Sequence, residues 1–272
     1  MKIVCVGDLG VDRYMPENKL LPGGITGNFT RQARRVFKPD DQIQLISAIG
    51  TDEEEAAVAL AAVNQPGIES HITFYEGKTP VQYIEIHDDG EKNFTKYEKG
   101  VLENFEINAA QEELIYEADL VMTPVYHQIT NVFAEVLSIQ TDAIIAVDFS
   151  DFSTDPDFEL LEDASEHFDI GFFGLKKSQT DLIEKLEQFA LDKNILVVIT
   201  LGEDGSIAFY DGAMISQDAK PVPTVIDTTG AGDAFAAGFL SRLSIDNDIQ
   251  ASLEKGSEIA AETIQHLGSV PE

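Results

Sequence analysis

The sequence contains a single cysteine, Cys5, and no tryptophan. One thiol excludes an intrachain disulfide and a zinc site built from several cysteines. Cys5 lies within an apolar run and is expected to be a core residue. The five histidines show no metal-ligand spacing such as His-Glu-x-x-His, so none of them is assigned to a metal.

Basic residues are scarce. The 18 lysines and arginines are outnumbered by 49 aspartates and glutamates, which gives a net charge of −31. Such a charge repels the phosphates of nucleic acids and the surface of anionic membranes, so we expect neither as a partner. A nucleotide ligand is not excluded, because it brings Mg²⁺ with it and because a helix N-terminus binds phosphate even in an acidic protein.

Long hydrophobic runs are also missing. No segment approaches the roughly 18 consecutive apolar residues that span a membrane. The apolar run at residues 1–7 is too short for the core of a signal peptide and lacks a cleavage pattern. We therefore expect a cytoplasmic protein, whose composition of 43% hydrophobic residues is that of a globular chain.

The segments that are present alternate between strand-like and helix-like patterns. Short apolar runs bounded by Gly, Asp or Pro predict strands buried on both faces, at residues 2–6, 43–48, 120–123, 143–148, 170–173 and 195–200. Helical spacing predicts helices, at residues 27–37, 53–63, 109–116, 131–138 and 178–192. The alternation predicts an α/β fold with a mostly parallel sheet covered by helices on both faces.

Two stretches depart from this alternation. Residues 72–75, 81–87 and 93–97 are rich in alternating β-formers and are joined by turns, which predicts a small antiparallel sheet with one wet face. The segment 205–222 contains short strands separated by a turn at Asp211 and Gly212. No linker is apparent, so we expect residues 1–272 to form a single domain with a β-lid drawn mainly from residues 72–97.

The segment 225–239 carries the strongest chemical signal. A strand ends near Ile226, the glycines allow a tight turn, and the carboxylate of Asp233 then stands in the first turn of a helix. Backbone N–H groups at a helix start, together with the helix dipole, favour an anion. The alternative without a catalytic role is that Asp233 only stabilises the N-terminus of its helix electrostatically.

Two other phosphate-binding motifs are excluded. The P-loop pattern, Gly-x-x-x-x-Gly-Lys-Ser/Thr, is absent from the chain. The dinucleotide fingerprint fails as well, because Phe235 stands where its third glycine is required and because the segment lies late in the chain. A dinucleotide-dependent oxidoreductase is therefore a weakened alternative.

The residues from Asp227 to Asp233, followed by a helix rich in Ala, Phe and Gly, resemble the C-terminal signature of the ribokinase-like (PfkB-type) carbohydrate kinases. Further segments resemble the motifs of that family in the same order, at residues 7–12, 22–28, 49–52 and 200–205. The resemblance covers almost the whole chain. It implies the ribokinase-like fold, and an ATP- and Mg²⁺-dependent kinase that phosphorylates a sugar hydroxyl.

Matching the motifs position by position implies a role for each residue. Asp233 would be the general base, and the amides of Gly230, Ala231 and Gly232 would stabilise charge on the transferred phosphoryl group. Asp12, Gly24 and Asn28 would hold the sugar. Thr200, Gly202 and Gly205 would line the nucleotide site. Asp227 and Thr229 match positions that bind an activating monovalent cation, K⁺, in some members. On their own, several of these would be ordinary turn or cap residues.

One departure from the family pattern concerns the metal. The family usually has Asn-x-x-Glu in the segment that corresponds to residues 176–182, where it supports Mg²⁺ through the water shell of the ion. Here the nearest match runs from Ser178 to Asp181. Asp181 either replaces the glutamate with a shorter reach or is only an acid on the helix surface.

Local resemblance also points to the acceptor. Residues 79–90, 148–151 and 261–268 look most like the fructoselysine 6-kinase branch of the family, which implies transfer to the 6-hydroxyl of a fructosamine. Glu85, Asp88 and Asp89 are candidates to pair with the ammonium groups of such a substrate, and the alternative is that they are merely solvated. A fructokinase- or ribokinase-type kinase of a simple sugar and a non-catalytic sensor on the same fold are the rival functions. The lid is expected to pair with the lid of a second copy.

Overall fold

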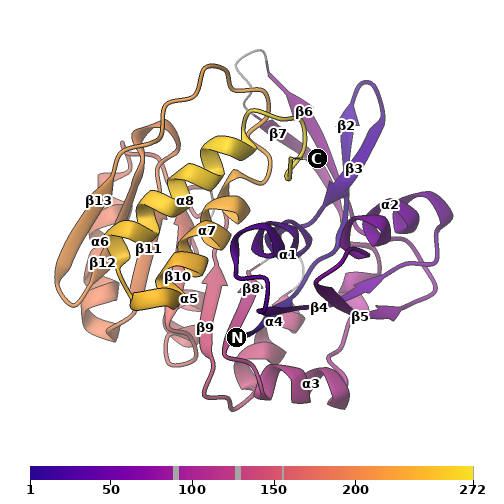
Figure 1. Ribbon diagram of the computed structural model, residues 1–272, viewed down its shortest axis with the longest axis horizontal. Coiled ribbons are helices and arrows are strands. Elements are labelled where there is room, and N and C mark those ends of the chain that lie inside the picture. Colours follow the sequence, from indigo (N-terminus) through magenta and orange to yellow (C-terminus); the bar gives the residue numbers. More distant parts are fainter. Residues whose placement is uncertain (88–91, 126–129, 155, 272) are drawn as a thin grey trace.

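Buried apolar runs form the strands of a large sheet (Figure 1). The structure is a computed structural model that describes residues 1–87, 92–125, 130–154 and 156–271. The large sheet has nine strands in the order β13-β12-β11-β10-β9-β8-β1-β4-β5. Seven of them are parallel, in chain order β1 (Lys2–Val6), β4 (Gln42–Ile49), β5 (Ile68–Phe74), β8 (Leu120–Pro124), β9 (Ile144–Asp148), β10 (Ile170–Gly174) and β11 (Leu196–Thr200). The antiparallel strands β12 (Ser206–Tyr210) and β13 (Ala213–Gln217) extend one edge. The predicted α/β fold with a mostly parallel sheet is confirmed.

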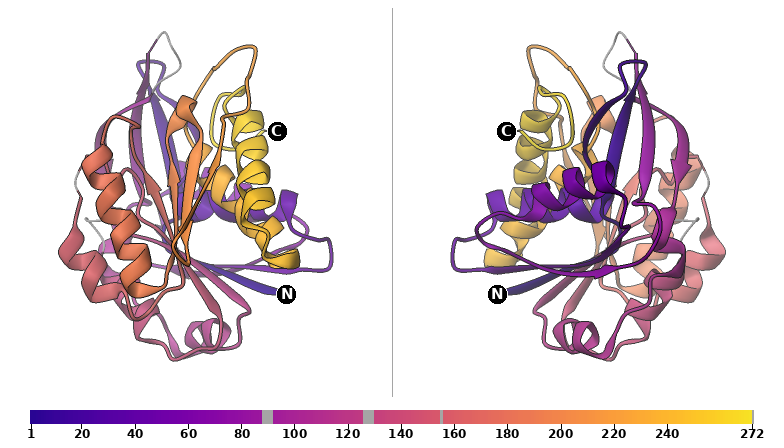
Figure 2. Two further views of the ribbon diagram at one scale, coloured as in Figure 1. Left: turned by 90° about the vertical axis from the view of Figure 1, so that its left-hand side faces the viewer. Right: turned by 90° about the vertical axis from the view of Figure 1, so that its right-hand side faces the viewer.

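Alternate side chains of each buried strand point to opposite faces of the sheet, and both faces are covered by helices. In β1, Val4 and Val6 belong to one hydrophobic core and Ile3 and Cys5 to the other. The first core is closed by α3 (Ala109–Tyr116), α4 (Thr130–Ser138), α5 (Phe158–Ala164) and α6 (Thr180–Lys193), and the second by α1 (Ile25–Val36), α2 (Glu53–Val63), α7 (Ala231–Asp246) and α8 (Ile249–Thr263). Figure 2 shows the sheet between these two layers. No helix within the described ranges is long and apolar enough to cross a membrane.

A second, small sheet of four strands stands beside the large one (Figure 1). Its order is β3-β2-β6-β7, with β2 (Gly10–Met15), β3 (Lys19–Gly23), β6 (Val81–Ile86) and β7 (Lys92–Glu98). We call these four strands the small sheet. Strands β2 and β6 are parallel, whereas the pairs β2–β3 and β6–β7 are antiparallel.

The origin of the small sheet corrects the sequence prediction in two respects. Residues 72–75 were expected in it, but residues 68–74 form β5, which pairs in parallel with β4 at the edge of the large sheet. Half of the small sheet comes instead from residues 10–23. Alternation predicts a strand but does not identify its neighbour, because pairing depends on backbone hydrogen bonds to distant segments.

The segment after β4 anchors the entry into β6. Asp52 accepts hydrogen bonds from the backbone N–H of Thr79, at 2.9 Å, and from its hydroxyl. A Cβ on Gly50 would overlap the backbone of Lys78 and Thr79, so only glycine allows this close approach. The Gly-x-Asp motif thereby fixes the start of the small sheet against the large one.

Candidate active site

Helix α7 begins at Ala231 and carries Asp233 in its first turn. Gly230 caps the helix in a left-handed conformation, φ 75°, and a Cβ there would lie 2.5 Å from that of Ser269. A Cβ on Gly232 would meet no atom within 4 Å, so this side of the helix start is open. The first N–H groups of a helix have no intrahelical acceptor, so the turn can bind an anion.

Asp233 is in direct contact with the predicted sugar-binding segment. Asn28, in α1, donates from Nδ2 to Oδ2 of Asp233 at 2.9 Å. The amide oxygen of Asn28 accepts from the hydroxyl of Ser269 at 2.5 Å, which fixes the orientation of the amide. All three side chains are buried. The structure thus brings the predicted base and Asn28 together, although no sequence pattern joined them.

Asp12 reaches the same site from β2. Its carboxylate lies so close to Gly23 that a Cβ at that position would overlap it. Gly24 follows with φ 93° and caps α1. Asp8 accepts hydrogen bonds from the N–H groups of Ile25 and Thr26 at 2.9 and 3.0 Å, so an acid outside the predicted set holds the start of α1.

Acidic side chains gather at this point. Five are buried: Asp8, Asp12, Asp148, Asp227 and Asp233. Burial and the negative charge of Asp148 raise the pKa of Asp233 well above its usual range, while the Asn28 hydrogen bond lowers it. Burial, Asp227 and Asp8 likewise raise the pKa of Asp12, and burial raises the pKa of Asp148 to about 6. Protonation of these carboxylates is therefore easier in the folded protein than in water.

Asp227 is held by three donors. Its Oδ1 accepts from the N–H of Thr229 at 2.8 Å, and its Oδ2 accepts from the N–H of Gly268 at 2.8 Å and from the hydroxyl of Tyr14 at 2.7 Å. The residue is fully buried. Most of the acceptor capacity of this carboxylate is therefore satisfied by the protein itself.

The predicted nucleotide residues follow β11. Thr200 ends the strand, and Gly202 and Gly205 bound a short 3₁₀ turn, η2 (Gly202–Asp204), that leads into β12. Gly205 has φ 93°, and a Cβ there would overlap the carbonyl oxygen of Gln217. The turn lies at the carboxyl edge of the parallel strands, which is where Asp148 ends β9 and Asp8 follows β1.

The other candidates are less constrained. Asp181 is exposed in the first turn of α6, which follows β10. Glu85 is exposed on β6, and Asp88 and Asp89 lie outside the described residues. Neither Asp181 nor Glu85 is brought to Asp233 by a described contact.

Four residues of the site were not assigned from the sequence: Asp8, Tyr14, Lys92 and Asp148. Asp8 and Asp148 each stand at the end of a buried strand, a signal that could have identified them. Tyr14 and Lys92 carry no such signal, because their roles depend on the pairing of the small sheet. Lys92 donates from Nζ to the carbonyl oxygen of Thr228 at 3.0 Å.

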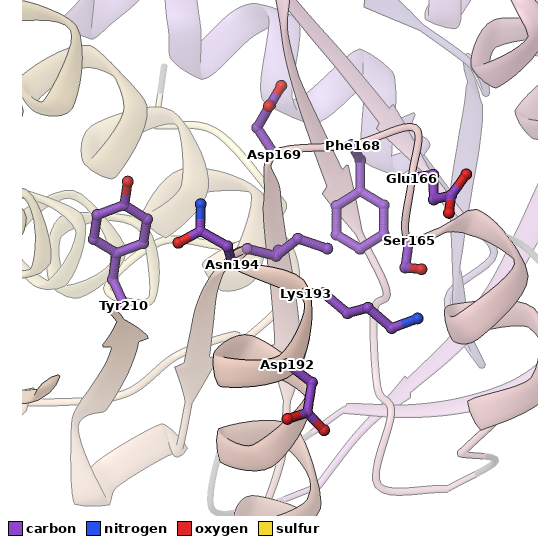
Figure 3. Close-up of a pocket in the computed structure, with 9 residues that line it drawn as sticks. Ser165, Glu166, Phe168, Asp169, Asp192, Lys193, Asn194 and Tyr210 are labelled. Atoms are coloured by element: carbon purple, nitrogen blue, oxygen red, sulfur yellow. The ribbon is translucent and has the colours of Figure 1, made fainter. Parts of the chain in front are cut away.

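A cavity of about 490 Å³ is lined by none of these residues. Figure 3 shows the side chains that line it. It is lined by residues that precede β10 and β11, such as Phe168 and Ile195, and therefore opens at the amino edge of these strands. Its labelled charged side chains, Glu166, Asp169, Asp192 and Lys193, point in different directions in Figure 3 rather than toward one point. Asp169 accepts from the N–H of Ile145 at 2.8 Å. This cavity is not a candidate for the chemistry.

Comparison with known proteins assigns the chain to a recognised group. Residues 2–271 match the family described as pfkB family carbohydrate kinase. The fructoselysine 6-kinase of Escherichia coli (strain K12) is 29% identical over 267 residues, which cover 98% of each chain. The fructosamine kinase FrlD of Bacillus subtilis (strain 168) is 27% identical over 275 residues, covering 99% of this chain and 93% of the relative.

Solved structures agree on the fold. A probable sugar kinase from Rhizobium etli CFN 42 superposes with a TM-score of 0.87 and 18% identity, covering 99% of this chain and 94% of that chain. The ribokinase of Arabidopsis thaliana, solved with ribose and ATP, superposes with a TM-score of 0.76 and 18% identity, covering 100% and 95%. At this identity the likeness establishes the ribokinase-like fold alone.

Proposed function

Since the chain belongs to the pfkB family of carbohydrate kinases and is an ATP-dependent sugar kinase, we propose that it phosphorylates the 6-hydroxyl of a fructosamine such as fructoselysine. In this proposal Asp233 is the general base. The order of the predicted motifs along the chain and the contact between Asn28 and Asp233 support this assignment of roles.

The observation that carries the mechanism is the place of Asp233. Its carboxylate is buried at the open start of α7 and is bonded to Asn28. A carboxylate about 3 Å from a sugar hydroxyl can accept its proton as the bond to phosphorus forms. The N–H groups of Gly230, Ala231 and Gly232 then stabilise the charge that develops on the transferred group. Ala231 already donates to the carbonyl oxygen of Thr228 at 3.2 Å.

The nucleotide is proposed to lie along Thr200, Gly202 and Gly205. Kinases of this family use ATP with Mg²⁺, and Mg²⁺ neutralises charge on the phosphates. Within the described residues no group of three His, Cys, Asp or Glu side chains could hold a metal. We propose that the ion binds together with the nucleotide and that Asp181 supports it through water. The proposal contains no step through a monovalent cation, because the protein already satisfies Asp227.

The acceptor is proposed to be held by Asp12, Gly24 and Asn28. The buried carboxylates of Asp227 and Asp8 raise the pKa of Asp12, whereas the cations that act on Asp12 are Lys92 and Arg31. Such an excess of acid disfavours a sugar phosphate and favours an acceptor that carries ammonium groups, provided that desolvation does not cancel the gain. The names of the two relatives, a fructoselysine 6-kinase and a fructosamine kinase, support the same acceptor class.

The test is a comparison of kcat/KM with ATP for fructoselysine, fructose, ribose, tagatose 6-phosphate and fructose 1-phosphate. We expect fructoselysine to be the best acceptor. If a simple sugar is better by more than about tenfold, which is about 1.4 kcal/mol of transition-state stabilisation, the fructosamine assignment fails and the kinase remains one of simple sugars.

A second copy of the chain is the proposed partner of the small sheet. Strands β3 and β7 are the outermost strands of that sheet among the described residues, and unpaired strand edges favour association. Phe94 on β7 is 53% exposed. The molar mass measured by light scattering during size-exclusion chromatography tests this proposal. A mass that is strictly that of a monomer contradicts it.

A further inference from the structure

Two side chains of the small sheet bond to the turn that precedes α7. Tyr14, on β2, donates its hydroxyl to Asp227 at 2.7 Å. Lys92, on β7, donates its ammonium to the carbonyl oxygen of Thr228 at 3.0 Å. Residues of two different strands therefore contact two successive residues of one turn.

The carbonyl oxygen of Thr228 has a second donor, the N–H of Ala231, at 3.2 Å. This N–H belongs to the proposed anion-binding turn, and its bond to Thr228 is at the long end of the usual range. A charged ammonium is the stronger of the two donors. When Lys92 occupies the carbonyl, the Ala231 N–H is held less tightly and becomes available to a negatively charged group at the open start of α7.

Tyr14 acts on the other end of the same turn. The Asp227 carboxylate accepts from the Tyr14 hydroxyl with one oxygen and from the N–H of Thr229 with the other. Tyr14 therefore holds the carboxylate that orients the backbone of Thr229. Burial raises the pKa of the Tyr14 hydroxyl, which therefore stays a donor at neutral pH. The main-chain direction on both sides of Thr228 is thus set by the small sheet.

We propose that Tyr14 and Lys92 are positioning residues that complete the anion-binding turn at the start of α7 when the small sheet lies against it. This inference rests on the proposed function of that turn in phosphoryl transfer. Its consequence is that phosphoryl transfer is efficient only with the small sheet in place, so that ATP is not lost to water when the acceptor is absent.

The test compares Lys92→Met and Tyr14→Phe with control variants of the same sheet. Lys96→Met and Tyr83→Phe are suitable controls, because Lys96 pairs with Glu98 and its Nζ lies 5.1 Å from the ring centroid of Tyr83, and no described hydrogen bond joins either side chain to the turn. Each test variant is expected to lower kcat by about tenfold or more, approaching the 10²–10³ expected for loss of a donor to the developing charge. The KM values for ATP and for the acceptor should change by less than about threefold. Lys92→Arg should restore most of the kcat, because arginine keeps the charge and the donor.

A second readout does not depend on turnover. In hydrogen exchange followed by mass spectrometry, the peptide that contains residues 227–234 should exchange faster in Tyr14→Phe than in the wild type and the controls, because Asp227 loses a donor. In Lys92→Met it should exchange more slowly, because the N–H of Ala231 then no longer shares the carbonyl oxygen of Thr228. In the double variant, the factor by which kcat falls should be smaller than the product of the factors for the two single variants, since both residues act on one turn.

The outcomes separate the two proposals. If the wild type phosphorylates no acceptor of the panel, the proposed function fails, and hydrogen exchange alone then tests the turn. If the wild type is active but Lys92→Met and Tyr14→Phe match the controls in kcat and in exchange, the positioning role is overturned. A rise in the KM values with kcat unchanged overturns the positioning role as well, because that result assigns both residues to ground-state binding.

Discussion

Asn28 donates a hydrogen bond of 2.9 Å to Asp233, although the two residues are 205 positions apart in the sequence. The bond joins the first turn of α7 to α1, so the residue proposed as base and a residue proposed to hold the sugar share one contact. Ser269 fixes the other end of the Asn28 amide. An acceptor bound by Asn28 therefore lies beside the proposed base.

Replacing Asp233 by Asn should remove the base and keep its shape. We expect kcat to fall by on the order of 10² to 10⁴, the usual contribution of a positioned general base, with little change in nucleotide binding. Because burial raises the pKa of Asp233, the substitution should not lower the melting temperature at neutral pH. Asp246→Asn, at the exposed far end of α7, is the matched control. A near-normal kcat for Asp233→Asn would contradict the proposed role of Asp233 as the general base.

Asp12→Ala should act mainly on the acceptor. The lost hydrogen bonds to a charged group correspond to a rise in the acceptor KM of about 10- to 100-fold, while the KM for ATP stays close to that of the wild type. Gly23→Ala should raise the same KM, because its Cβ would displace the Asp12 carboxylate. A rise confined to ATP in steady-state kinetics shows that the acceptor site is misplaced.

Stability should fall as pH rises through the range in which Asp148 ionises. Its pKa is raised from 3.8 to about 6 in the folded protein, so the folded state binds the proton more tightly between these values and the free energy of unfolding decreases with pH there. Urea unfolding at pH 4, 5, 6 and 7 measures this slope. Asp148→Asn, which can still accept from the N–H of Ser150, should have a flatter slope, and an identical slope contradicts the prediction.

Activity should not require a monovalent cation. Asp227 already accepts hydrogen bonds from Thr229, Gly268 and Tyr14, so both of its oxygens have protein donors. Rates in K⁺, Na⁺ and tetramethylammonium chloride at equal ionic strength should agree within about twofold, less than 0.5 kcal/mol. Activation by K⁺ of more than about tenfold would show that the cation competes successfully with these donors.

Asp181→Asn should raise the Mg²⁺ concentration needed for half-maximal activity. The effect should be small, about threefold, because Asp181 is exposed and would act through water against solvent screening. Glu184→Gln is the control, since Glu184 is an exposed acid of the same helix. An equal response of the two variants to Mg²⁺ identifies Asp181 as a surface acid only.

Much of the large sheet could be predicted from local pattern. The bounds of α2 and α3 agree with the predicted ranges 53–63 and 109–116, and the apolar run of residues 2–6 forms β1 as expected. These segments bury apolar side chains at the spacing of their own secondary structure, so their pattern is complete within a few turns. The match of residues 2–271 to the pfkB family confirms the family that the motifs resemble.

The small sheet shows where local pattern fails. Residues 72–75 alternate as a strand should, yet they pair with β4 in the large sheet, and Val11 of β2 pairs with Val81 of β6. A strand satisfies its backbone only through a neighbour, and the choice of neighbour depends on the whole chain.

The amino-acid sequence by itself determined the α/β alternation, the glycine-rich turn before α7 and the presence of Asp233 in the first turn of that helix. Tertiary structure alone decided which side chains lie around Asp233 and the turn before it: Asn28 from α1, Asp8 beyond β1, and Lys92 and Tyr14 from the small sheet. A turn or a helix start depends on neighbouring residues and can be predicted from them. A buried cluster of acids and its donors depends on contacts between distant segments, which exist only after the two sheets have formed.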